Sequence, residues 1–146
     1  MDELLKNEYL NPVGCCCEGR SSEYILSASR QNSLCGDDFQ LFSSDRKDPG
    51  SHCFTGHMCS IAKVSSSLMI RTSRKIADPV ELRSLIGSQV LIKDALGLFS
   101  ILEECELLDH ETLKLIQHFS DELSKFPTRN SCAILPWQAY LDAVGG

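Results

Sequence analysis

Residues 52–69, HCFTGHMCSIAKVSSSLM, decide the fold, because the hydrophobic pattern changes within them from that of a strand to that of a helix. Residues 52–55 fit a short strand, and Gly56 allows the chain to change direction sharply. From Cys59 onward apolar residues recur at helical spacing, with three serines at 65–67 forming a small-residue side. This stretch therefore predicts the boundary between a strand region and a helical region.

Before this boundary the sequence predicts a short helix and two strands. Residues 2–10 have the spacing of a helix that ends at Asn11-Pro12, and residues 22–30 and 37–43 fit strands. The polar run at 44–50 is typical of a hairpin turn.

After the boundary the pattern is helical. Asp78 followed by Pro79 is a strong helix start, because Asp caps the first turn and Pro tolerates the first helical position. One or two helices are expected from there to Phe99, with Gly87 as a candidate break. Asp109 starts another helix, and a last one covers residues 132–144. Strands followed by helices are typical of an α+β fold with helices against one sheet face.

Composition narrows the class of protein. The 146 residues fit one domain, and a net charge of -6 without a basic stripe argues against nucleic-acid binding. No stretch approaches the roughly 18–20 apolar residues of a membrane span, and the N-terminus does not resemble a signal peptide. A cytoplasmic, reducing location is therefore expected, where disulfides are rare. The eight cysteines are then expected to be metal ligands, nucleophiles or buried apolar residues rather than bridges.

Three cysteines and one aspartate stand out as candidate ligands. In Cys35-Gly36-Asp37, the glycine lets the backbone turn so that a thiolate and a carboxylate can face one centre, a pair that suits zinc or ferrous iron. Cys59 and Cys132 are both expected at helix starts, where unpaired N–H groups favour a thiolate. Arg129 places a positive charge near Cys132. A half-buried structural cysteine is the plain alternative for each.

The other candidates are less distinctive. His57 lies two residues before Cys59 and is an alternative ligand for the same centre. Cys53 is expected to be a core strand residue, Cys105 to lie in a helix interior, and the triplet at 15–17 to form an unusual turn. No phosphate-binding glycine loop and no HExxH pattern is present, so the sequence offers no machinery of an ordinary hydrolase or nucleotide enzyme.

Three motifs in this order resemble one protein family. They are LCGD at 34–37, FTGHMCSIA at 54–62, and KFPTRNSCAIL at 125–135 followed by Trp137. Asn11-Pro12 and ALGLF at 95–99 match as well. The chain is similar to the SufU branch of the NifU/IscU iron–sulfur cluster assembly proteins along nearly its whole length.

The resemblance implies a fold, a site and a partner. The fold would be a three-stranded antiparallel sheet packed by helices. Cys35, Asp37, Cys59 and Cys132 would bind zinc, iron or a transient iron–sulfur cluster. A SufS-like cysteine desulfurase would supply persulfide sulfur, with Cys35 as the first-choice acceptor, Cys132 as the second, and Asp37 tuning ligand exchange. The protein would be a scaffold or sulfur acceptor, and at most a zinc-dependent sulfurtransferase.

Three positions beside the predicted site differ from the family pattern. Met58 replaces a glycine before Cys59, Ser131 replaces a lysine beside Cys132, and Pro136 replaces an alanine in the last helix. Pro136 removes a helical hydrogen bond to the carbonyl of Cys132. These changes keep an alternative open, in which the protein is a structural zinc-binding adaptor or a degenerate paralogue without sulfur transfer.

Overall fold

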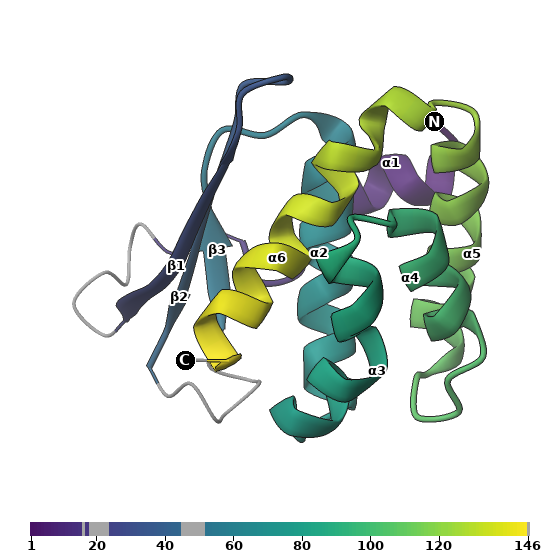
Figure 1. The fold of residues 1–146 in the computed structure, drawn as a ribbon. Helices are drawn as coiled ribbons and strands as arrows, with labels where there is room; N and C mark the ends of the chain where they lie inside the picture. Colours follow the sequence, from purple (N-terminus) through teal and green to yellow (C-terminus); the bar gives the residue numbers. More distant parts are fainter. Residues whose placement is uncertain (16, 18–23, 45–51, 146) are drawn as a thin grey trace.

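The computed structural model describes residues 1–15, 17, 24–44 and 52–145, and it has an α+β fold (Figure 1). The strands are β1 (Ile25–Asn32), β2 (Asp37–Ser43) and β3 (Cys53–Thr55). The helices are α1 (Glu3–Leu10), α2 (Ser60–Lys75), α3 (Pro79–Leu91), α4 (Ala95–Glu103), α5 (His110–Ser124) and α6 (Asn130–Gly145), with a 3-10 turn, η3 (Pro127–Arg129), before α6. In the described part of the chain, no helix is both long and apolar enough to span a membrane.

The three strands form one antiparallel sheet in the order β1-β2-β3. In the central strand, buried residues alternate with half-buried ones, and Phe39 and Leu41 point into the core. Figure 1 shows the helices gathered on one side of this sheet. The predicted fold class, an α+β fold with a three-stranded antiparallel sheet packed by helices, is confirmed.

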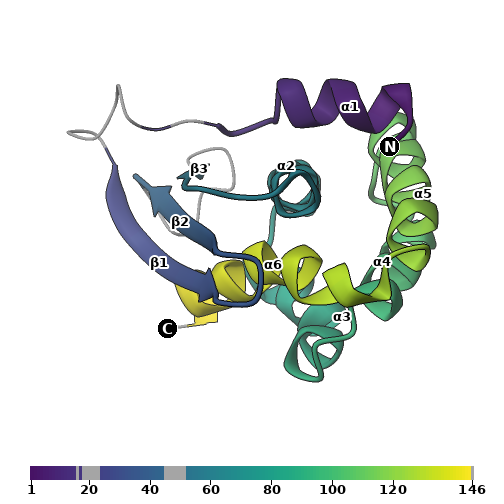
Figure 2. The same cartoon turned by 90° about the horizontal axis from the view of Figure 1, so that it is seen from above.

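Two long helices, α2 and α6, lie between the sheet and the remaining helices when the molecule is viewed from above (Figure 2). The three serines at 65–67 are all buried, and Ser65 is the one that bonds to α6. Ser65 Oγ accepts a hydrogen bond from Trp137 Nε1 at 2.9 Å and donates to the carbonyl of Ala133. Of the predicted small-residue side of α2, Ser65 therefore faces α6, whereas Ser67 faces α1 through Glu8.

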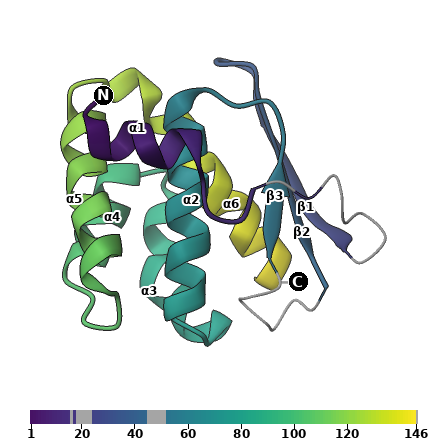
Figure 3. The same cartoon turned by 180° about the vertical axis from the view of Figure 1, so that it is seen from behind.

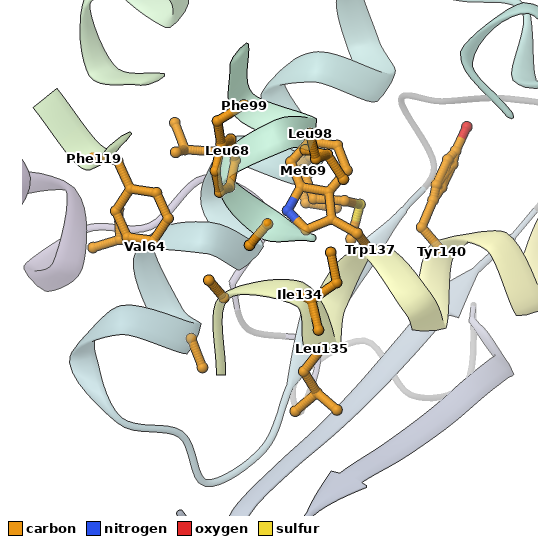
Figure 4. Close-up of a cluster of buried hydrophobic side chains, with 14 of the residues drawn as sticks. Val64, Leu68, Met69, Leu98, Phe99, Phe119, Ile134, Leu135, Trp137 and Tyr140 are labelled. Carbon is orange, nitrogen blue, oxygen red and sulfur yellow. The ribbon is translucent and has the colours of Figure 1, made fainter. Parts of the chain in front are cut away.

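Aromatic and aliphatic side chains fill the space behind α2 and α6 (Figure 4). Phe99 contacts both Phe119 and Trp137 edge to face, with ring centroids 5.1 and 5.8 Å apart. All three rings are fully buried. This cluster joins α4, α5 and α6 into one core and gives α6 a fixed place against the sheet.

The N-terminal helix α1 crosses the outside of α5 and α2 (Figure 3) and brings a carboxylate into the interior. Glu8 is 6% exposed and accepts hydrogen bonds from Arg71 Nε at 2.7 Å and Nη2 at 3.1 Å, and from Ser67. Burial alone would lower the pKa of Arg71, but its hydrogen bond with Glu8 and the charges of Glu8 and Glu111 together outweigh this and raise the pKa. The pair anchors α1 to the middle of α2.

Glu8→Ala is expected to lower the free energy of unfolding by about 2–3 kcal/mol, because it leaves a half-buried guanidinium without its main partner. The exposed Glu3, on the same helix, supplies the control: Glu3→Ala should cost no more than about 0.5 kcal/mol. Urea denaturation of both variants checks this. Equal stabilities of the two variants would contradict a structural role for the buried pair.

Several predicted boundaries need correction. Gly87 does not break a helix, because it lies inside α3; the turn comes at Lys93, whose φ is 59°, before Asp94 caps α4. Cys105 lies in the turn after α4 rather than in a helix interior. β1 begins one residue later and ends two residues later than the described part of the predicted strand, and residues 22–23 of that prediction lie outside the described residues. So do residues 45–50 of the predicted turn.

A disulfide joins Cys17 to Cys53, so the expectation that the cysteines form no bridges was wrong for this pair. Cys53, which was predicted to be a core strand residue, does lie in β3 but is disulfide-bonded. Cys17, which was predicted to be part of a turn, is its disulfide partner. The linker that follows α1 runs beside β3: the carbonyl of Gly14 accepts the N–H of Phe54 at 2.9 Å, and Cys15 forms a parallel bridge with Phe54. This tertiary contact brings the two sulfurs together. Cys16 lies outside the described residues.

Candidate metal centre

The four predicted ligands lie close together at one end of the sheet, although they come from distant parts of the chain. Cys35 is in the turn between β1 and β2, Asp37 begins β2, Cys59 caps α2 and Cys132 is in the first turn of α6. One ligand atom each from Cys35, Asp37 and Cys132 lie within 4.8 Å of one another. Cys59 Sγ is 3.8 Å from Asp37 Oδ2, which places the fourth residue at the edge of this group.

His57, the alternative ligand, is not part of this group among the described residues. Its backbone carbonyl instead accepts the N–H of Asp38 at 2.7 Å. That bond attaches the segment before Cys59 to the edge of β2. The loop thus brings Cys59 to the site through its backbone, without a need for the imidazole.

The turn that carries Cys35 is open to solvent. Gly36 has a φ of +68°, a left-handed conformation that favours glycine, and no atom lies within 4 Å of where its β-carbon would be. Leu34, on the other side of Cys35, is 84% exposed. Cys35 itself is half-buried. The glycine that was predicted to let Cys35 and Asp37 face one centre has the required backbone conformation.

Asp37 links the turn to the start of α2. Its carboxylate is 2% exposed, and Oδ1 accepts the backbone N–H of Cys59 at 2.9 Å. Cys59 Sγ in turn accepts the N–H of Ala62 at 3.5 Å, as the capping side chain of the helix. The helix start predicted at Cys59 is confirmed. Because one carboxylate oxygen holds the backbone of Cys59, the other is left to face the thiols.

Cys132 is the innermost of the four, with no exposed surface. Its Sγ lies 2.7 Å from Cys35 Sγ. Asn32 Nδ2 also donates to it at 3.5 Å and to Ser131 Oγ at 3.1 Å, while Asn32 Oδ1 accepts the N–H of Leu34. Sequence reasoning missed Asn32. The strand predicted over residues 22–30 ends before it, and its place at the end of β1, directly opposite Asp37, is seen only in the structure.

The electrostatics of the site favour a cation. Burial raises the pKa of Cys132 well above its usual range, and its hydrogen bonds with Cys35 and Asp37 and the charge of Cys59 raise it further. Arg129 supplies the positive charge predicted nearby, since its hydrogen bond with Cys132 and the charge of Cys59 raise its pKa. One guanidinium faces three thiols and a carboxylate. A bound divalent ion would remove the excess of acidic groups.

The donor set fits zinc or ferrous iron. Ligands about 2.0–2.3 Å from a tetrahedral ion lie roughly 3.3–3.8 Å from one another. The 3.8 Å between Cys59 Sγ and Asp37 Oδ2 is within this range, whereas the 2.7 Å between Cys35 Sγ and Cys132 Sγ is shorter, so these two sulfurs would move apart to bind one ion. Small side-chain rotations of Cys35, Asp37, Cys59 and Cys132 would complete four ligands, and the hard carboxylate beside soft thiolates matches both metals.

Ser131, which bonds to Asn32, is one of three departures from the family pattern, and the other two can also be placed. Met58 has a negative φ, since Lys93 is the sole non-glycine residue with positive φ in the described chain. Its Sδ accepts a hydrogen bond from Ser66 at 3.5 Å, so its side chain lies against α2. Pro136 is buried inside α6, which continues through it to Gly145. The backbone around Cys59 and Cys132 thus accommodates both residues.

Comparisons with known proteins bear on the fold alone. No protein-family model matches the chain, and no curated protein matches it. Among solved structures, the crystal structure of a protein described as hypothetical is similar, with a TM-score of 0.62 and 20% identity. The match covers 98% of this chain and 95% of that one. The whole chain therefore has an architecture found in a crystal structure, and its function must be argued from the site.

Proposed function

We propose that this protein is a cytoplasmic iron–sulfur cluster assembly protein that accepts persulfide sulfur from a cysteine desulfurase. The observation that carries the proposal is the meeting of a solvent-accessible Cys35 with Asp37 and Cys132 within 4.8 Å. A sulfur acceptor needs a thiol that a partner can reach and neighbours that control its reactivity. The SufU-like motifs around these residues support the same reading.

Cys35 is the acceptor that the geometry favours. Its turn is exposed on the outer side, whereas Cys132 has no exposed surface and its raised pKa disfavours the thiolate. The Cys35 thiolate would attack the terminal sulfur of the partner's persulfide. A Cys35–S–SH group forms, and the partner's cysteine leaves as a thiolate. The earlier second choice, Cys132, is less suited to this first step.

Zinc or iron bound by the four ligands would hold the thiols as thiolates until the partner docks. One residue of the chain would allow the metal ligands to exchange. As the carboxylate among three thiolates, Asp37 would be the ligand that opens most easily, while its Oδ1 keeps the hydrogen bond to the Cys59 backbone. Whether the metal is a resident zinc or an iron on its way into a cluster, the same residues would hold it.

A second candidate function, a structural zinc-binding adaptor, has one observation in its favour. Two of the four ligands, Asp37 and Cys132, are 2% and 0% exposed, as in a closed structural site. Such a site would not stimulate a desulfurase. The same experiment therefore separates the two functions.

The test measures turnover of a SufS-like cysteine desulfurase with and without this protein, using ³⁵S-labelled cysteine. We expect the protein to raise turnover and to carry label on the tryptic peptide 31–46, in which Cys35 is the sole cysteine. Cys35→Ala should lose both effects, and Cys105→Ala, which removes a partly buried cysteine outside the site, should keep both. Label transfer to Cys35→Ala at the normal rate would refute the acceptor role.

A further inference from the structure

The two closest thiols of the site are positioned to form a disulfide. Cys35 Sγ and Cys132 Sγ are 2.7 Å apart, although the residues are 97 positions apart in the chain. A disulfide needs about 2.05 Å, so the sulfurs would have to approach by only about 0.7 Å. In the described chain both are free thiols.

We propose that Cys132 is a resolving cysteine: it attacks a persulfide on Cys35 and releases the sulfur as sulfide. This inference rests on the proposed function, which supplies the Cys35 persulfide. It adds a reductive step that delivers sulfur at the oxidation state found in iron–sulfur clusters.

The step balances within the chain. Cys132 Sγ attacks Sγ of Cys35–S–SH, a Cys35–Cys132 disulfide forms, and the terminal sulfur leaves as H₂S, which carries its own proton and the one that the Cys132 thiol gives up. The two cysteine sulfurs lose two electrons together, and the transferred sulfur gains them. A dithiol reductant of the cell must then reduce the disulfide before the next cycle.

Burial assigns the two roles. Cys35 is half-buried on an open turn, so a persulfide donor can reach it and an added sulfur atom has space. Cys132 has no exposed surface, so its natural partner is inside the protein. A pocket of about 310 Å³ nearby is lined by Leu34 and Ser131, the sequence neighbours of the two cysteines, and not by the cysteines themselves.

The position of Cys132 also favours release of sulfide over transfer of the persulfide from Cys35 to Cys132. Attack on the terminal sulfur would move the persulfide to Cys132, but the atom nearest to Cys132 Sγ is the inner sulfur, Cys35 Sγ. Cys59 is the competing nucleophile. Its thiol instead donates to Asp37 and accepts the N–H of Ala62, and it is not among the three residues whose ligand atoms lie within 4.8 Å of one another.

The experiment needs no desulfurase. The full-length protein as purified is treated with glutathione persulfide, desalted, and followed without reductant. Sulfide is measured by bimane derivatisation and the peptides by mass spectrometry. Cys35 and Cys132 are the sole cysteines of tryptic peptides 31–46 and 130–146, so their disulfide gives a unique linked peptide. The bridge between peptides 7–20 and 48–63, which hold Cys17 and Cys53, is the internal control.

We expect the wild-type protein to release one sulfide per loaded chain, with the 31–46/130–146 linked peptide appearing at the same rate. The rate should not depend on protein concentration, since the reaction is intramolecular. Cys132→Ser should slow release by at least about 100-fold and keep the persulfide on Cys35. Cys105→Ser, which removes a free thiol outside the site, should change the rate by less than about twofold. Cys132→Ala is a second variant, and the linked peptide in the wild type is a readout independent of both.

Three results would overturn the proposal: no loading of Cys35, migration of the persulfide to peptide 130–146, or equal release from wild type and Cys132→Ser. Failure of the proposed function is seen elsewhere, in the desulfurase assay. Because the persulfide is loaded chemically here, a protein that no desulfurase recognises would still show the Cys35–Cys132 step if the inference is right.

Discussion

Gly56→Ala is expected to lower the free energy of unfolding by about 3–5 kcal/mol, the largest stability loss we predict for a single methyl group in this protein. Gly56 has a φ of +138°, which side chains rarely adopt. A β-carbon there would also collide with the backbone carbonyl oxygen of Asp38, so neither the chain nor its neighbour can relax cheaply. Urea denaturation would measure the loss as a lower midpoint at an unchanged slope.

Gly87→Ala is the matched control. Gly87 lies within α3, and no atom lies within 4 Å of the position of an added β-carbon. The same substitution should there stabilise the protein by about 0.5–1 kcal/mol, because alanine favours a helix interior more than glycine does. If both variants unfolded at the midpoint of the wild type, the close approach of Gly56 to β2 would be wrong.

Asp37→Asn is expected to weaken zinc binding by more than about 100-fold, a larger loss than removal of an outer hydrogen-bonding residue causes. The amide oxygen can still accept the N–H of Cys59, so the start of α2 is kept. The negative charge that complements the metal is lost. Asp37→Ala should lose metal binding as well, and should also destabilise the protein because the buried N–H of Cys59 loses its acceptor.

Asp38→Asn provides the control for charge alone. Asp38 is the next residue of β2 and is half-buried, but its side chain is not part of the ligand group found in the described residues. Competition with a chromogenic zinc chelator would give the affinities of wild type and all three variants. Wild-type affinity in Asp37→Asn, with the fold intact by circular dichroism, would exclude Asp37 as a ligand.

Much of the fold was predictable because its signals are local. Asp78 and Asp109 accept backbone N–H groups at the starts of α3 and α5, as expected from the caps alone. β2 was predicted with its observed bounds because apolar residues alternate along it. Cys59 at the start of α2 follows from the change of period in the stretch around it.

What sequence reasoning missed depends on distant contacts. The Cys17–Cys53 bridge requires the linker after α1 to run beside β3, and nothing near either cysteine indicates that course. Asn32 supports Cys132 across 100 residues of chain. Gly87 looked like a break because glycine is a poor helix former, but burial of Leu82, Ile86 and Val90 stabilises α3 through it. The candidate site residues could be predicted from the sequence motifs. Their burial, and which thiol is the more accessible, could not be predicted, because both depend on the packing of distant segments.

The Cys17–Cys53 bridge divides the four ligands into two mechanical units. It closes a covalent ring that contains β1 and β2, so Cys35 and Asp37 lie inside the ring, whereas Cys59 and Cys132 lie outside it. Tension on the ends of the chain cannot extend the ring. The bridge therefore keeps about 120 Å of chain from being extended, because 36 residues separate the two cysteines and each spans roughly 3.3–3.6 Å when extended. Under load the site would therefore part between these two pairs, with the β1–β2 turn retained as one piece.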